Sequence, residues 1–169
     1  PPSPPPPSPI PPHTSIPALP LLYANLSSIH EPHIAALAID DNLVTFCHSE
    51  TEDNPWLSVA VPHSQLNTPS TISQIIIFNR QDPDSYHRLS PFQLWVGMSI
   101  GDHDSPTSFE CGLHNLTVPA GPGPFSFHCQ GQAGEFVTLM LPGRQRTLNI
   151  AEIRVYSPFA SPSPPPPSP

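Results

Sequence analysis

Residues 56–61 read Trp-Leu-Ser-Val-Ala-Val, and this stretch decides the fold class. The apolar residues Leu57, Val59 and Val61 alternate with their neighbours, so they share one face of an extended chain. Residues 125–129, Phe-Ser-Phe-His-Cys, repeat the same alternation. Alternation with a period of two predicts half-buried β-strands.

Similar runs recur along the chain between turns that contain Gly, Pro, Asn or Asp, and no convincing helical period separates them. The candidate strands are Trp56 to Val61, Ile72 to Phe78, Phe92 to Gly97, Phe125 to Cys129, Phe136 to Leu141 and Ile150 to Tyr156. The run Ile75–Phe78 is apolar on both faces, which predicts a central strand covered on two sides. Strands with this spacing predict an all-β fold, an antiparallel β-sandwich of two sheets.

Both ends of the chain are rich in Ser and Pro. Residues 1–9 read PPSPPPPSP and residues 161–169 read SPSPPPPSP. Proline fixes φ and lacks a backbone N–H, so these ends predict polyproline II spacers. We divide the chain into a spacer over 1–20, a β-sandwich over 21–157 and a spacer over 158–169. The near-identity of the ends predicts one unit of an array of sandwiches and rods, and so self-association into a fibre.

Composition argues against two classes of partner. The formal net charge is −8, and all five basic residues are Arg, with no Lys. The positive surface that phosphate backbones or anionic lipids require is therefore missing. No apolar run approaches the roughly 18 residues of a membrane-spanning helix. We expect no nucleic-acid partner and no membrane insertion.

Several features indicate an extracellular protein. The triplets Asn25-Leu-Ser and Asn115-Leu-Thr fit the N-glycosylation rule, and both lie in polar stretches that we predict to be surface loops. The chain has three Cys, which in a secreted protein implies one bridge and one leftover thiol. With no initiator Met and no signal-like stretch, we expect a processed chain or an excerpt of a longer one.

No motif points to catalysis, so we predict that the protein is not an enzyme. His30-Glu-Pro-His33 has zinc-like spacing, but its Pro prevents the regular helix that places two His on one face. No Ser lies in a nucleophile-elbow pattern.

A series of short motifs, taken in order, resembles a known family. The motifs are Ala38-Ile39-Asp40-Asp41-Asn42, Cys47-His48-Ser49, Asn54-Pro55-Trp56, Asn79-Arg80-Gln81-Asp82, Arg88-Leu89, Val96-Gly97, Phe127-His128-Cys129, Leu141-Pro142-Gly143 and Glu152-Ile153-Arg154-Val155. From about Leu21 to Tyr156 the chain resembles the F-type lectins, the fucose-binding branch of the discoidin-like, galactose-binding β-sandwiches. The Ser-Pro-Pro-Pro-Pro blocks resemble the hydroxyproline-rich glycoproteins of green-algal and plant cell walls, whose prolines are hydroxylated and O-glycosylated.

The lectin resemblance implies a jelly-roll sandwich with a structural calcium held by Asp40, Asn42 and Glu152. Calcium prefers hard oxygen ligands, and these side chains with loop carbonyls would clamp two distant segments together. The alternative is that Asp40-Asp41-Asn42 is only an Asx turn.

The same resemblance implies a shallow sugar pit with His48, Arg80 and Arg88 as its polar contacts and Asp82 holding the Arg pair. A guanidinium offers several fixed donors and suits the adjacent hydroxyls of a sugar. The alternative is that the two Arg form ordinary surface ion pairs with Asp82 and Asp84. The chain departs from the family between Asp82 and Arg88, where it has one extra residue and lacks an adjacent Cys pair.

For the cysteines, the resemblance implies a disulfide between Cys111 and Cys129. Cys47 would pair in the family with a Cys at the position of Ala151, so we expect it to be unpaired. It is then either a small buried apolar residue or a thiol available to a neighbouring chain.

Two functions follow from these observations. In the first, the protein is a structural module of an extracellular, hydroxyproline-rich fibre or cell-wall assembly, built on a lectin-like sandwich. In the second, it is an active calcium-dependent lectin that binds fucose-type glycans and gains strength through multivalency.

Overall fold

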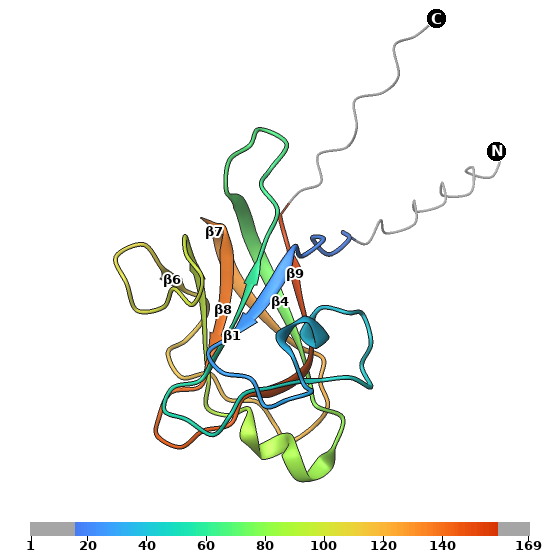
Figure 1. Ribbon diagram of the computed structural model, residues 1–169. Coiled ribbons are helices and arrows are strands. Elements are labelled where there is room, and N and C mark those ends of the chain that lie inside the picture. Colours follow the sequence, from blue (N-terminus) through green and yellow to red (C-terminus); the bar gives the residue numbers. More distant parts are fainter. Residues whose placement is uncertain (1–15, 159–169) are drawn as a thin grey trace, which may run out of the picture.

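The computed structural model describes residues 16–158, which form two antiparallel sheets packed face to face (Figure 1). One sheet has the strand order β1-β3-β8-β5-β6 and the other has the order β2-β9-β4-β7. The strands are β1 (Tyr23–Leu26), β2 (Cys47–His48), β3 (Trp56–Ala60), β4 (Ser70–Asn79), β5 (Gln93–Gly97), β6 (Phe109–Glu110), β7 (Phe125–Gly134), β8 (Phe136–Met140) and β9 (Asn149–Tyr156). The predicted fold class, an antiparallel jelly-roll β-sandwich, is confirmed. The predicted Ser/Pro spacers fall largely outside the described residues.

Every candidate strand from the sequence is present, with ends that shift by a few positions. Three short strands, β1, β2 and β6, were not predicted. Each is too short to show an alternation, and its partner in the sheet supplies the hydrogen bonds that define it. Two 3₁₀ helices also lie between strands, η1 (Ala35–Ala38) and η2 (Pro83–Arg88).

The prediction that both glycosylation triplets lie in loops is half right. Asn115 is exposed in a loop with a φ of 56°, as Asn tolerates. Asn25 instead belongs to strand β1, where it pairs with Ser58 of β3. The loop prediction for Asn25 was wrong because polar Asn-Leu-Ser-Ser also suits the exposed edge of a sheet.

The core lies between the two sheets and contains the predicted inward faces. Leu57 and Val59 have no exposed surface, and β4 is central in its sheet, between β9 and β7. Only one face of β4 is fully covered, however, because Ile75 and Ile77 are buried whereas Ile76 is half-buried on the outer face. The prediction of cover on both sides is corrected accordingly.

A disulfide joins Cys111, which follows β6, to Cys129 of β7, as the family resemblance implied. Since β6 and β7 belong to different sheets, the bond ties the two layers together. Cys47 is buried in the core without exposed surface, and burial raises the pKa of its thiol to about 12. Of the two alternatives, the small buried apolar residue is therefore the one observed.

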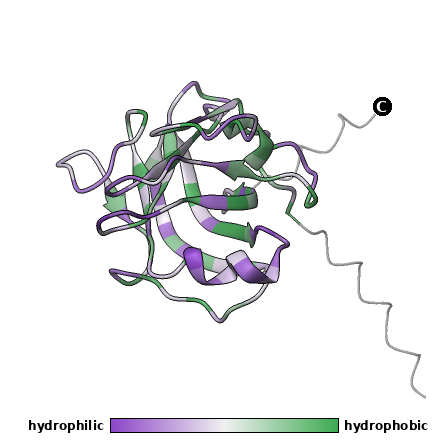
Figure 2. Cartoon of the chain, turned by 60° about the horizontal axis from the view of Figure 1, so that its bottom comes forward, coloured by the Kyte–Doolittle hydropathy of each residue, from purple (hydrophilic) through white to green (hydrophobic). Residues whose placement is uncertain are grey.

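The two ends of the sandwich differ in what they carry. The described chain begins and ends at the upper end in Figure 1, where the backbone N–H of Leu19 donates to the carbonyl of Val155 at 2.7 Å. The loop over residues 61–69 projects from this same end. At the opposite end lies η2, which is largely hydrophilic in Figure 2. Within residues 16–158, no helix is long and apolar enough to cross a membrane.

Candidate functional site

The loop after β4 is held by a buried asparagine. Asn79 has no exposed surface, and its side-chain amide donates to the carbonyls of Tyr86 and Gly121, both at 3.2 Å. The next turn begins with Asp82, whose carboxylate accepts from the backbone N–H of Asp84 at 3.2 Å and caps η2. These contacts place Arg80 before η2 and Arg88 at its end.

Arg80 is fixed from two sides. Its guanidinium carbon lies 4.0 Å from the centre of the Phe46 ring, a cation–π contact. Its Nη2 lies 3.2 Å from Oδ2 of Asp82, whereas no ion pair joins Asp82 to Arg88 among the described residues, so Asp82 contacts one Arg of the pair that the lectin resemblance assigns to it. The Nε of Arg80 is buried without a hydrogen-bond partner among the described residues. The side chain is half-buried, and these contacts fix the orientation of the guanidinium plane from which its N–H groups donate.

His48 in β2 presents a neutral acceptor to this region. Its Nδ1 lies 2.7 Å from the carbonyl oxygen of Ser49, which can only accept, so Nδ1 carries the proton and Nε2 carries a lone pair. Arg88 Nη1 lies 3.5 Å from that Nε2. Burial lowers the pKa of His48, and the nearby charges of His30, Arg88 and Arg80 lower it further. The imidazole is therefore neutral at physiological pH.

The structure thus brings His48, Arg80 and Arg88 together at one end of the sandwich, and we call these three residues the His48 pit. The alternative, that the two Arg form ordinary surface ion pairs, holds only for Arg80, which pairs with Asp82. Among the described residues, no carboxylate lies within ion-pair distance of Arg88, and Asp84 pairs with neither Arg. Arg88 therefore keeps donors available for a ligand.

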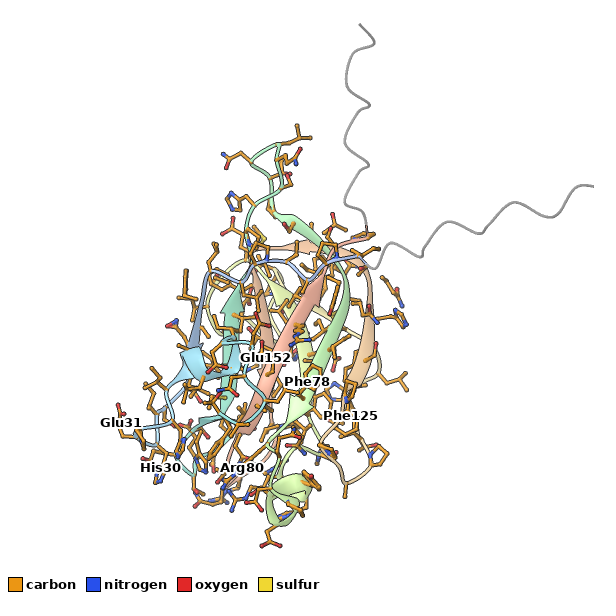
Figure 3. The ribbon with its side chains drawn as sticks, turned by 90° about the vertical axis from the view of Figure 1, so that its right-hand side faces the viewer. His30, Glu31, Phe78, Arg80, Phe125 and Glu152 are labelled. Atoms are coloured by element: carbon orange, nitrogen blue, oxygen red, sulfur yellow. A yellow bond between two sulfur atoms is a disulfide. The ribbon has the colours of Figure 1, made fainter. Side chains whose placement is uncertain are left out.

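Three aromatic or imidazole rings that sequence reasoning did not place there border the pit. The ring of His30 lies 4.9 Å from that of His48, and the ring of His33 stacks on Phe46 at 4.1 Å. Figure 3 shows His30 and Arg80 at the same end of the molecule. His30 and His33 had attracted a zinc interpretation, but no group of three or more His, Cys, Asp or Glu suited to a metal occurs within residues 16–158.

Arg146 is a further residue that the sequence did not reveal. Its Nη2 donates to the carbonyls of Arg88 at 3.0 Å, Ser90 at 3.2 Å and Pro91 at 3.2 Å, and its Nη1 donates to Pro142 at 2.8 Å. Burial lowers the pKa of its guanidinium, which stays protonated because arginine is so basic. Arg146 therefore anchors the backbone that carries Arg88. A lone Arg before Thr147 gives no sequence signal for this role.

The predicted calcium ligands come from two segments, the loop that contains Asp40 and Asn42 and strand β9. In the loop, Asp40 Oδ1 accepts from the N–H of Asn42 at 3.0 Å, and Asn42 Oδ1 accepts from the N–H of Val44 at 3.1 Å. This loop is therefore an Asx turn, the alternative considered above. Its side-chain oxygens already accept hydrogen bonds within the loop, and each retains lone pairs.

The second segment, β9, contributes Glu152, which is only 2% exposed. Its Oε2 is buried and has no hydrogen-bond partner among the described residues. Burial, together with the negative charge of Asp41, raises the pKa of this carboxyl to about 7, against the opposing effect of Arg154. Glu152 pairs with Phe78 in the sheet, and Figure 3 shows it farther up the sandwich than Arg80.

A cavity of about 340 Å³ adjoins Glu152 and is also lined by Asp41, Arg154 and residues 18–21. The unpartnered oxygen of Glu152 and the excess negative charge beside it suit a hard cation. Since no cluster of three acidic or imidazole side chains occurs among the described residues, backbone carbonyls and the amide of Asn42 would have to complete the coordination.

No protein-family model matches the sequence, and no curated protein matches it either. Solved structures do match. An F-lectin (fucolectin) from the serum of the striped bass, Morone saxatilis, is 26% identical with a TM-score of 0.65, over 79% of this chain and 44% of that chain. The chain thus spans less than half the length of the fish protein. This is a lectin fold.

Two bacterial modules share the lectin fold along nearly their whole length. A fucose binding module from Streptococcus pneumoniae is 17% identical with a TM-score of 0.65, over 85% of this chain and 97% of that one. The family 32 carbohydrate-binding module of NanJ from Clostridium perfringens, solved in complex with galactose, is 17% identical with a TM-score of 0.64. The match covers 83% of this chain and 98% of that one. The structural neighbours of this lectin-fold chain are therefore F-type lectins and discoidin-like modules, as the sequence indicated.

Proposed function

We propose that this protein is a non-catalytic carbohydrate-binding module that binds a fucose-type sugar in the His48 pit. The observation that carries the proposal is the convergence of a neutral imidazole acceptor with the donors of two guanidinium groups, where Nη1 of Arg88 lies 3.5 Å from Nε2 of His48. These groups match the mixed donor and acceptor character of neighbouring sugar hydroxyls. The alignment with a bass fucolectin and a pneumococcal fucose binding module supports the choice of fucose.

The rings beside the pit supply the apolar part of such a site. Sugars carry C–H faces as well as hydroxyls, and protein sites for small ligands combine apolar surface with a few polar groups. His33 stacks on Phe46 at 4.1 Å and Phe46 contacts Arg80, while the ring of His30 lies 4.9 Å from that of His48. A deoxysugar such as fucose, with its methyl group, suits this combination better than a fully hydroxylated sugar does.

We further propose that calcium binds beside Glu152 and supports the fold at that point. The ligands would be Glu152, Asp40 and Asn42 together with loop carbonyls. The unpartnered Oε2 of Glu152 and its raised pKa support this, because a buried carboxylate without a partner gains most from a cation. Calcium would contribute charge neutralisation there and would join the loop to β9.

The setting of the module is the second part of the proposal. We infer an extracellular protein, N-glycosylated at Asn25 and Asn115, that is part of a hydroxyproline-rich fibre or cell-wall assembly. The Ser-Pro-Pro-Pro-Pro blocks at both ends of the sequence support this. So does the position of the His48 pit, which faces away from the end where the described chain begins and stops. Repetition along such an array would convert weak binding into avidity.

The test is a calorimetric titration of the full chain with L-fucose in calcium, repeated after chelation. We expect saturable binding that Arg80→Ala abolishes. Arg144→Ala is the matched control, because that side chain is 90% exposed and its Nε lies 3.8 Å from Oδ2 of Asp53, which is not a residue of the pit. Absence of binding by a folded chain would refute the sugar-binding function, and the structural role would then have to be tested alone. D-Galactose in place of fucose measures specificity.

A further inference from the structure

A concave surface lies at the opposite end of the sandwich from the His48 pit. A groove of about 410 Å³ runs over the upper ends of β1, β3 and β8. We call it the Tyr23 groove. Leu22, Tyr23, Ala60, Pro62 and Phe136 line it.

The register of the sheet explains the shape of the groove. Ala60 pairs with Tyr23 on one side and with Phe136 on the other, so these three side chains share the outer face of the sheet. The rings of Tyr23 and Phe136 stand 6.2 Å apart in an edge-to-face arrangement across the small alanine. The result is a trough with an alanine floor and aromatic walls.

The groove exposes apolar surface that nothing among the described residues covers. Tyr23 is 46% exposed and Leu22 is 60% exposed, and both precede or begin β1, the edge strand of its sheet. No hydrogen bond of the Tyr23 hydroxyl to another described residue is present. The rim carries His63 and Glu135, whose Nε2 and Oε1 lie 3.3 Å apart, and hydrogen bonds with Asn67 and Glu135 raise the pKa of His63. An uncharged ligand with apolar ridges and acceptor groups fits this surface.

We propose that the Tyr23 groove binds a Ser-Pro-Pro-Pro-Pro segment from a second copy of this chain. Proline-rich segments in the polyproline II form dock into grooves lined by aromatic rings, because their rings pack on the aromatics and their carbonyls accept from donors such as a tyrosine hydroxyl. The sequence provides this ligand at residues 3–7 and again at 163–167. These segments carry no charge and suit the apolar lining of the groove.

The attachment of the chain ends favours a neighbour's segment over the protein's own. Leu19 is hydrogen-bonded to Val155 of β9, in the sheet that does not carry the groove, and the described chain stops at residue 158 shortly after β9. A segment of the same molecule would have to double back from there toward Tyr23. Proline-rich segments are semi-rigid over several residues and resist such a reversal. A segment from another copy can reach the groove without such a reversal.

This inference names the contact behind the proposed self-assembly and is independent of sugar binding. The experiment uses the full chain produced in bacteria, so that neither Asn25 nor proline carries a glycan. The ¹⁵N-labelled protein is titrated with the synthetic peptide Ser-Pro-Ser-Pro-Pro-Pro-Pro-Ser-Pro, residues 161–169. We expect amide shifts confined to the groove, at Leu22, Tyr23 and Phe136, and none at the His48 pit.

Sedimentation equilibrium of the same chain then measures assembly. We expect concentration-dependent self-association that excess peptide reverses and that Tyr23→Ser weakens about tenfold. Leu22→Ser should act in the same direction, and both sites are exposed enough to leave the fold intact. Leu113→Ser is the matched control, because this leucine is 79% exposed and does not line the groove, and it should change nothing. Arg80→Ala should also leave assembly unchanged while it abolishes fucose binding.

Three outcomes would overturn the inference. Absence of groove shifts in a chain that still self-associates would leave the proposed assembly standing and place its contact elsewhere. Groove shifts in a chain that stays monomeric at every concentration would assign the groove to the protein's own segment. Self-association that is insensitive to both Tyr23→Ser and the peptide would also exclude the groove as the contact.

Discussion

Nη1 of Arg88 lies 3.5 Å from Nε2 of His48, although 40 positions separate the two residues in the sequence. A guanidinium can only donate, so this contact requires the lone pair of a neutral imidazole. The lowered pKa of His48 supplies that state. The pair therefore presents a donor and an acceptor side by side, and this arrangement depends on the protonation of one ring.

Affinity for L-fucose should depend on pH through His48. Its pKa lies below the ordinary value of 6.5, so the ring stays neutral above that pH and binding should be constant there. As the pH falls further, protonation removes the acceptor and repels Arg88 and Arg80, and affinity should drop. Calorimetric titration between pH 8 and pH 5 measures this. His48→Gln, which keeps an acceptor oxygen, should bind L-fucose more weakly but should not lose affinity at low pH. If the variant lost affinity at low pH to the same extent, the titrating group would be His30 or His33 and not His48.

Phe46→Ala should weaken fucose binding about fivefold, because the guanidinium of Arg80 loses the ring that orients it. The fold should remain, since Phe46 is only half-buried. Phe109→Ala on β6, where the ring is 49% exposed, serves as the matched control. Unchanged affinity in the Phe46 variant would mean that Asp82 alone positions Arg80.

Arg146→Ala should lower the free energy of unfolding by about 2 kcal/mol, because several backbone carbonyls lose a charged donor. It should also weaken fucose binding, since the backbone of Arg88 is one of those acceptors. Urea unfolding gives the first quantity. The exposed Arg144→Ala should change stability by less than about 0.5 kcal/mol, and equal losses in the two variants would contradict the anchoring role.

In the absence of divalent cations, stability should fall as the pH rises through the titration of Glu152. The folded state holds its proton up to a pKa of about 7, whereas the unfolded state releases it near 4.5. Folding is therefore favoured below 4.5 and loses that advantage toward pH 7, by an amount on the order of 3 kcal/mol. Thermal unfolding at a series of pH values should show the decline.

Glu152→Gln should remove this decline, because the amide does not titrate. Calcium should raise the melting temperature of the unmodified chain at pH 8 by binding only the folded state, and should leave the variant unaffected. If calcium stabilised both proteins equally, the cation would have to bind elsewhere than beside Glu152.

The long strands were predictable because each one alternates in a way that a single stretch of sequence displays. Strand β3 is an example: Leu57 and Val59 point inward and Ser58 points outward, where its hydroxyl lies 3.0 Å from that of Thr138. Strand β1 was not predictable, since its four residues form a strand through pairing with β3. The same dependence on a partner explains why Asn25 was placed in a loop.

The residues of the site likewise fall into those that could be predicted from the sequence and those that could not. His48, Arg80 and Arg88 were named in advance because short motifs around them resemble a lectin pattern. The rings of His30, His33 and Phe46 were missed, since their place beside the pit follows from how separate loops meet. Residue identity alone carries no information about such contacts. The roles of all these residues in binding stay predictions.

The bond between Leu19 and Val155 has a mechanical consequence. Because the chain enters and leaves the sandwich side by side at one end, tension along it does not stretch the two sheets. Such a pull acts first on this bond, which lies at the point where the incoming and outgoing segments separate. The segment before β1 would peel from β9 while the far end of the molecule, with Arg88 and His48, carried no load. A fibre built from such units would lengthen under strain and keep its ligands.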